Sequence, residues 1–174
     1  DGQIQGFLEP LHRPYTGAGL LAMAAGMDKW ITKRIWESEG LPVGPYVGLT
    51  EERWQREREH CLADLAPLGL PVFVKPANLG SSIGIEKVKT ADALAASLDR
   101  AFRFDRRVVV EKGLDAREIE LAVLGGDDPI VSVPGEILPA GEFYDFQDKY
   151  IDGKMDQTRV VRIDVVHVSG KARR

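Results

Sequence analysis

The sequence predicts an α+β protein, and three observations support that fold class. Short runs rich in valine, such as residues 72–74 and 108–112, have the composition of β-strands. Other segments, such as residues 28–39, carry apolar side chains at helical spacing. The order helix, strand, strand, helix, strand lacks the regular alternation of a doubly wound parallel sheet, so we expect a small mixed fold.

The first predicted helix covers residues 28–39. Trp30, Ile31 and Ile35 recur at helical spacing, and Asp28 can cap the start of the helix. The segment ends at a glycine and a proline, which do not continue a helix.

A second helix is predicted over the highly charged residues 51–66, which end just before Pro67. Its thin apolar stripe would face the protein, and its many charges are those of a solvated surface. The stripe consists of Trp54, Cys61, Leu62 and Leu65.

The middle of the chain predicts a hairpin, a helix and further strands. Residues 72–75 and 85–88 flank a Gly/Ser loop, and Thr90 can cap a helix that carries Leu94 and Leu98 at turn spacing. Strands are expected at residues 108–112, 118–125 and 159–168, with a turn at residues 125–129 before the short run IVSV. Residues 139–154 have no clean period and predict a long loop, and long ordered loops are often functional.

Composition excludes several classes of protein. The 174 residues carry a net charge of -4, and nucleic-acid or membrane-surface binders use a basic face instead, so we expect neither partner. No apolar run approaches the length of a membrane span. Cys61 is the only cysteine, so no internal disulfide or cysteine-based zinc cluster can form, and a reducing, cytoplasmic setting fits.

The loop after residues 72–75 has the chemistry of an anion site. Glycine lets backbone N–H groups approach a ligand closely, while Ser81, Ser82 and the ammonium of Lys75 add donors and charge. The lysine precedes the glycines and the loop returns as a strand, so this is not the familiar P-loop. Taken alone, the pattern fits a plain hairpin loop equally well.

Two further features add a nucleotide-like pattern. Glu111 and Lys112 end an apolar strand, where they could hydrogen-bond an adenine amino group. Glu118 begins the next strand, where a carboxylate can accept from ribose hydroxyls. Each residue by itself is equally a surface charge at the end of a strand.

Six motifs occur in order along the chain. They are MDK at 27–29, GLPVGPYV at 40–47, GLPVFVKPANLGSSIGI at 69–85, VVVEKGL at 108–114, REIELAVLG at 117–125 and EFYDFQDKYIDGK at 142–154. With these motifs at compatible spacing, the chain closely resembles D-alanine–D-alanine ligases of the ATP-grasp superfamily. The resemblance runs almost continuously from residue 1 to about 154.

The resemblance implies an ATP-grasp fold and the joining of two D-alanine molecules through an acyl-phosphate, with ATP and Mg²⁺, or Mn²⁺ in its place. A homodimer is usual in that family. The product would serve peptidoglycan synthesis. Relatives with a histidine in place of Tyr150 tend to make the D-lactate ester, so this tyrosine favours the dipeptide.

Site residues follow from the resemblance position by position. Lys29 and Lys75 match lysines that contact phosphate, and Ser81, with Ser82 beside it, matches the serine of the closing loop that orients the first D-alanine. Tyr150, preceded by Lys149, matches the aromatic residue of a second lid. The adenine-edge segment is matched by Glu111, Lys112 and Leu114, and the ribose carboxylate by Glu118.

The match is incomplete at both ends. Residues 1–27 resemble only the last part of the family's N-terminal domain, residues 28–117 its central domain with a linker helix, and residues 118–174 a shortened C-terminal domain. The first residue is not methionine, which suggests a longer protein. Arg162 and Asp164 are either a retained phosphate-contacting arginine and metal-binding aspartate or a chance match.

Two hypotheses therefore remain open. In the first, the chain is a partial D-alanine–D-alanine ligase sequence. In the second, it is a non-catalytic remnant that binds nucleotide or merely folds. The absent acid-x-Asn pair, which holds metal in the family, leads us to expect no turnover by this chain alone.

Overall fold

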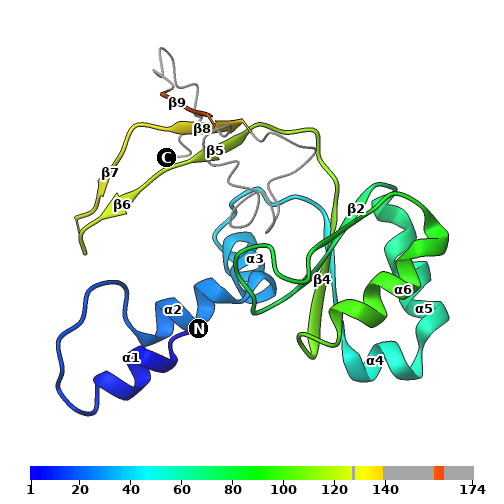
Figure 1. Cartoon of the computed structure of the whole chain (residues 1–174), viewed down its shortest axis with the longest axis horizontal. Helices are drawn as coiled ribbons and strands as arrows, with labels where there is room; N and C mark the ends of the chain where they lie inside the picture. The colour runs from blue at the N-terminus through cyan, green and yellow to red at the C-terminus, as the bar shows by residue number, and fades with distance from the viewer. Residues whose placement is uncertain (127, 139–158, 163–174) are drawn as a thin grey trace. The chain divides into compact units, whose positions relative to one another are not determined.

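The computed structural model describes residues 1–126, 128–138 and 159–162 (Figure 1). The chain divides into two compact units, Asp1–Leu114 and Asp115–Arg174. The three-part division expected from the sequence stays a prediction. No described helix is both long enough and apolar enough to cross a membrane.

The first unit is built on a four-stranded antiparallel sheet. Its strands are β1 (Tyr46–Thr50), β2 (Val72–Pro76), β3 (Glu86–Val88) and β4 (Arg107–Lys112), in the order β1-β4-β2-β3. The strands predicted around residues 72–75, 85–88 and 108–112 are confirmed. Strand β1 was not predicted, because its glycine and the preceding prolines resemble a loop sequence.

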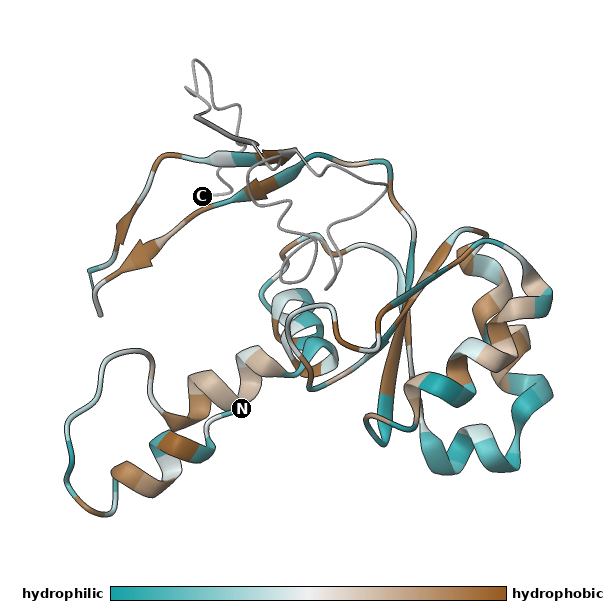
Figure 2. Ribbon diagram, in the orientation of Figure 1, coloured by the Kyte–Doolittle hydropathy of each residue, from teal (hydrophilic) through white to brown (hydrophobic). Residues whose placement is uncertain are grey.

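Helices α4 (Glu51–Arg56), α5 (Arg58–Leu65) and α6 (Ala91–Ala101), with the short 3₁₀ helix η1 (Ala66–Leu68), lie together on one side of the sheet (Figure 1). Side chains alternate between the two faces of a strand, so every second residue of β2 and β4 meets these helices. The resulting core includes Val72, Val74, Val108, Val110, Leu49, Trp54, Leu65, Leu94 and Leu98. Figure 2 shows β4 mostly hydrophobic and α4 mostly hydrophilic.

The predicted helix over residues 51–66 is wrong in one respect, since it consists of α4 and α5. The backbone of Glu57 adopts φ -136° and ψ 46°, outside the helical region, so the helical ladder stops there. No glycine or proline marks this break in the sequence. The apolar stripe is nevertheless oriented as expected, since Trp54, Cys61 and Leu65 are buried.

Three helices precede the sheet: α1 (Gln3–Leu8), α2 (Leu20–Met27) and α3 (Lys29–Ser38). The predicted helix at residues 28–39 is confirmed as α3, and its cap is also confirmed, because Asp28 Oδ1 accepts from the backbone N–H of Ile31 at 2.9 Å. Helices α1 and α2 were not predicted and contain no buried residue.

Helix α3 packs against the face of the sheet opposite α4–α6. A Cβ atom added to Gly48 of β1 would lie 2.0 Å from the Trp30 indole, so the glycine permits the close approach of helix and strand. Its neighbour Leu49 points into the core on the other face.

The second unit is described through five strands, β5 (Glu118–Glu120), β6 (Val123–Leu124), β7 (Ile130–Val131), β8 (Gly135–Leu138) and β9 (Arg159–Arg162). Strands β5, β8 and β9 form one antiparallel sheet, and β6 pairs with β7. The predicted strand at 118–125 is thus divided in two, and the predicted turn before IVSV is confirmed. The predicted loop at 139–154 lies outside the described residues, as does the part of the predicted strand beyond residue 162.

Candidate functional site

The candidate site lies on the α3 side of the first unit's sheet. Phe73 and Lys75 of β2 stand opposite Glu111 and Val109 of β4, respectively, so these four side chains share one face. The register therefore brings Lys75 and Glu111 together, although the two residues are far apart in the sequence.

Glu111 is held between two ammonium groups. Lys75 Nζ lies 2.7 Å from Glu111 Oε2, and Lys33 Nζ of α3 lies 3.3 Å from Oε1. Burial alone would raise the pKa of Glu111, but the attraction of Lys75 and Lys33 outweighs it and lowers the pKa below its usual range. The carboxylate is therefore ionised at neutral pH and leaves a net positive cluster.

Lys29 contacts the start of the Gly/Ser loop. Its Nζ donates to the carbonyl oxygens of Pro76 at 3.0 Å and Ala77 at 3.4 Å, and also to that of Leu79. Its backbone N–H donates to Ala77 O at 2.9 Å. Burial, with the nearby charge of Lys75 adding to it, lowers the pKa of Lys29.

The loop between β2 and β3 has an unusual backbone. Ser81 and Ser82 have φ angles of 54° and 59°, in the left-handed region that residues other than glycine rarely adopt. Two turns fix them, because Ile83 N–H donates to Gly80 O at 3.1 Å and Ile85 N–H donates to Ser82 O at 3.2 Å. Left-handed turns of this kind are used in proteins to build anion-binding concavities.

A second contact fixes the entry to the loop. The backbone N–H and the side-chain amide of Asn78 both donate to Asp105 Oδ2, at 2.7 Å and 3.0 Å. At the exit, a Cβ atom on Gly84 would lie 2.9 Å from both Phe104 and Pro76. The loop is thus positioned at both ends by residues of the same unit.

The predicted adenine-edge segment lies at the end of β4. Lys112 is exposed, and its backbone N–H donates to Pro45 O at 2.9 Å. Leu114 is 57% exposed and lies against Gly44. The Glu111 side chain contacts Lys75 and Lys33, and the role of this segment at an adenine edge stays a prediction.

Of the predicted site residues, the structure brings Lys75 and Glu111 into direct contact, with Lys29 close enough for the charges of both to act on it. Glu118 is exposed on β5 of the second unit. Arg162 is the last residue of β9, described for its backbone only. Lys149, Tyr150 and Asp164 lie outside the described residues. Over the described part of the chain, no group of three or more His, Cys, Asp and Glu residues could hold a metal ion.

Lys33 and Asp105 were missed by the sequence analysis. Lys33 follows Lys29 by four residues on α3, so the two side chains lie on one helical face, and that spacing could have indicated a shared site. Asp105 gave no signal, because an acidic residue in a short connection resembles any surface charge.

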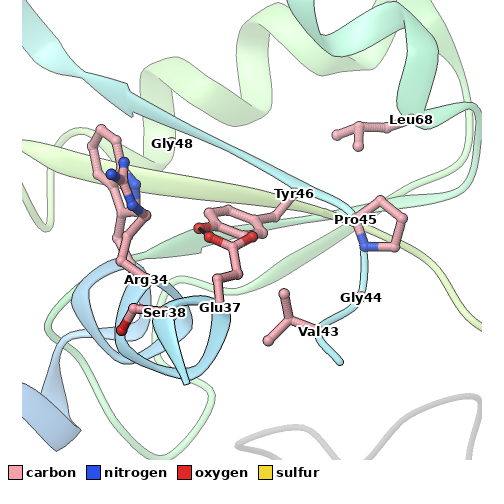
Figure 3. A pocket seen from close by; sticks show the side chains of 10 residues that line it. Arg34, Glu37, Ser38, Val43, Gly44, Pro45, Tyr46, Gly48 and Leu68 are labelled. Atoms are coloured by element: carbon pink, nitrogen blue, oxygen red, sulfur yellow. Dashed lines mark hydrogen bonds between the residues drawn. The ribbon is translucent and has the colours of Figure 1, made fainter. Parts of the chain in front are cut away.

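A separate cavity of about 740 Å³ lies between α3 and β1 (Figure 3). Glu37 and Tyr46 point toward one another there, and Tyr46 Oη donates to Glu37 Oε2 at 2.8 Å. Burial, with this hydrogen bond adding to it, raises the pKa of Tyr46 to about 12. Among the described residues of the first unit, none of the predicted site residues lines this cavity.

Comparison with known proteins gives concordant results. Residues 35–169 match the family model described as D-ala D-ala ligase C-terminus. A D-alanine–D-alanine ligase from Bacillus licheniformis is 49% identical over 157 residues, which cover 90% of this chain and 44% of the relative.

Two solved structures are similar. D-alanyl-alanine synthetase A from Vibrio cholerae is 33% identical with a TM-score of 0.77, and covers 92% of this chain and 47% of that one. The VanG D-Ala:D-Ser ligase from Enterococcus faecalis is 34% identical with a TM-score of 0.75, and the match covers 86% of this chain and 43% of that one.

The chain spans less than half the length of each of these relatives. The predicted α+β class and the ATP-grasp fold are confirmed by the similar structures. Since the family model covers most of the sequence, the chain belongs to the D-ala D-ala ligase C-terminus family.

Proposed function

We propose that this chain forms the nucleotide-binding part of an ATP-dependent ligase that joins two D-alanine molecules. The observation that carries the proposal is the face of the first unit, where Lys29 and Lys75 lie beside the Gly/Ser loop and Glu111 pairs with Lys75. Family membership and the relatives' names support the same reaction.

The chemistry of this face suits bound phosphate. Activating a carboxylate by phosphoryl transfer depends on positioning the phosphates and neutralising their charge. Lys29 and Lys75 are cations with fixed positions, and Ser81 and Ser82 add polar groups at the turn of the loop. A preorganised positive face of this kind costs little reorganisation when the anion binds.

The catalytic assignments belong to the same proposal. Ser81 would orient the first D-alanine, and Lys149, Tyr150 and Arg162 would meet substrate and phosphate. Mg²⁺ or Mn²⁺ would neutralise phosphate charge, with Asp164 as the proposed ligand. Asp164 lies outside the described residues, so this assignment rests on the resemblance to the family alone.

The second substrate is the least supported part. One similar structure is named a D-Ala:D-Ser ligase, so the fold alone does not select D-alanine, and Tyr150 remains the reason to propose the dipeptide.

We also propose a cytoplasmic homodimer. Exposed Ile4, Phe7 and Leu21 of α1 and α2 support that residues 1–27 contribute to its contact.

Calorimetry with ATP and Mg²⁺ tests the proposal that this chain binds ATP. Lys75→Ala should weaken ATP binding about 10-fold to 100-fold, the usual cost of losing a charged hydrogen bond. Arg106→Ala is the matched control, because Arg106 also lies next to β4 but its side chain is 92% exposed. Equal affinities of the wild type and Lys75→Ala would refute the assignment of Lys75.

A phosphate-release assay with D-alanine and ATP then distinguishes an active ligase from a non-catalytic remnant of one. Turnover would support the ligase in this chain itself, while ATP binding without turnover would support a non-catalytic nucleotide-binding fragment. Absence of ATP binding would overturn both and leave a merely folded fragment.

A further inference from the structure

Glu111 contacts its two lysines through different oxygen atoms. Lys75 pairs with Oε2 and Lys33 with Oε1, and the three side chains are only 13% to 22% exposed. A carboxylate with both oxygens engaged cannot rotate without breaking an ion pair. The orientation of the oxygen that holds Lys75 therefore depends on Lys33.

We propose that Lys33 is a positioning residue for the phosphate-binding lysine Lys75, acting through Glu111. Lys33 does not contact the ligand in this proposal; it fixes the carboxylate that fixes Lys75. The inference rests on the proposed function, since it gives Lys33 a role in binding the phosphates of a nucleotide.

Because Glu111 is largely buried, a single lysine partner is not enough to keep its carboxylate ionised. A carboxylate removed from water loses hydration, and it stays ionised only if nearby charges and hydrogen bonds compensate. The cations facing Glu111 are Lys33 from α3, Lys75 from β2 and, at longer range, Lys29. Lys29 is engaged with loop carbonyls, so Lys33 is the partner that lets Glu111 stay charged when Lys75 turns toward a phosphate.

Helix α3 does not need Lys33 for its attachment to the sheet. Asp28 at its start pairs with Arg107 of β4, and Trp30 packs on Gly48. The backbone N–H of Lys29 also donates to Ala77 O at 2.9 Å. With these contacts in place, the ion pair of Lys33 adds little to the docking of α3 and acts mainly on Glu111.

The Lys33 side chain is itself held in place. Its ammonium lies 5.2 Å from the centre of the Tyr46 ring, within the range of a cation–π interaction. Tyr46 is fixed in turn by its hydrogen bond to Glu37. Lys33 is therefore constrained before any ligand binds, as a positioning residue must be.

The test compares three variants. Lys33→Met removes the charge but keeps most of the stem, Lys33→Arg keeps the charge, and Arg34→Met removes a neighbouring positive charge on α3 that does not pair with Glu111. Carbon-13 NMR of the Glu111 carboxyl measures its pKa without ligand, and calorimetry measures the affinities for ATP and for adenosine.

We expect Lys33→Met to raise the pKa of Glu111 toward its usual value and to weaken ATP binding about tenfold, the effect of losing one charged contact. Adenosine, which lacks phosphates, should bind within about twofold of wild type, whereas a loosened fold would weaken both ligands. Lys33→Arg should restore most of the ATP affinity, and Arg34→Met should change neither the pKa nor the ratio of the two affinities.

An unchanged pKa of Glu111 in Lys33→Met would overturn the inference, as would equal weakening of ATP and adenosine binding. If the wild type binds neither ligand, the proposed function fails. The carboxyl titration then still decides whether Lys33 controls Glu111.

Discussion

The strands of the two units differ in how far they are buried. In the first unit, β2 alternates between buried and half-buried residues, and β4 has three consecutive buried residues, Val108, Val109 and Val110. In the described part of the second unit, β5, β6 and β7 are exposed at every residue, although Figure 2 shows β6 and β7 as hydrophobic. Both units have paired strands, but only the first shows a layer of helices over its sheet among the described residues.

The difference teaches that hydrogen-bonded strands do not by themselves make a stable support for a site. A sheet gains independent stability when one face is packed on a core. Lys75 and Glu111 stand on strands whose other face is packed in this way, so their positions are set within the first unit. Glu118 stands on a strand whose residues are all exposed, and the described part of the second unit shows no helix packed on that strand.

The largest expected effect comes from the core of the first unit. Leu98→Ala should lower the free energy of unfolding by about 2–5 kcal/mol, because Leu98 is 0% exposed and its removal leaves a cavity. Leu124→Ala is the control, since Leu124 is 75% exposed and should change that free energy by less than about 0.5 kcal/mol. Urea denaturation measures both, and similar losses would break the comparison.

A smaller effect is expected from two ion pairs. Asp28 is 2% exposed, caps α3 and pairs with Arg107, so Asp28→Ala should lower the free energy of unfolding by about 2 kcal/mol. Glu136→Ala should cost less, because its partner Arg117 is 65% exposed and water screens the pair. Denaturation in low and high salt measures both, and a larger loss in Glu136→Ala would contradict the comparison.

The smallest effect is expected in the pH dependence of stability. The pKa of Glu111 is lowered by folding, so its contribution is present above the usual glutamate pKa and is lost as the pH falls through the lowered value. The difference between wild type and Glu111→Gln should be on the order of 1 kcal/mol at neutral pH and should shrink on acidification.

The pKa of Glu136 is also lowered, through its hydrogen bond to Arg117, so acid should reduce its contribution in the same direction. High salt should weaken the exposed pair of Glu136 more than the buried contacts of Glu111. Denaturation curves between about pH 3 and pH 7 at two salt concentrations check both statements, and equal salt sensitivity would remove the proposed distinction.

The fold could be predicted where one physical signal dominated. Apolar periodicity and the cap at Asp28 located α3, and runs of branched residues located β2 and β4. Strand β1 was missed because Gly48, which admits the Trp30 indole, resembles a loop residue in the sequence. The break between α4 and α5 depends on the backbone torsion angles of Glu57, and no glycine or proline in the sequence indicates it.

The sequence could predict that Lys75 directly precedes a Gly/Ser loop between two strands, and the structure has this arrangement, while the role of these residues in binding stays a proposal. Pairing partners were harder, because they depend on strand register and on the approach of α3. The register places Glu111 opposite Phe73, two pairs along from Lys75 and on the same face of the sheet, so the carboxylate can reach the Lys75 ammonium. The contact of Glu111 to adenine that the sequence suggested stays a prediction.

The contact between Trp30 and Gly48 affects more than packing. Lys29 and Lys33 are carried on the same helix as Trp30, so the absence of a side chain at Gly48 sets how far their ammonium groups stand from β2 and β4. Gly48 carries no charge, yet it sets the distance between these two ammonium groups and the sheet. In redesigning this face, changing the residue at 48 would shift two cations together, whereas replacing either lysine would remove only one.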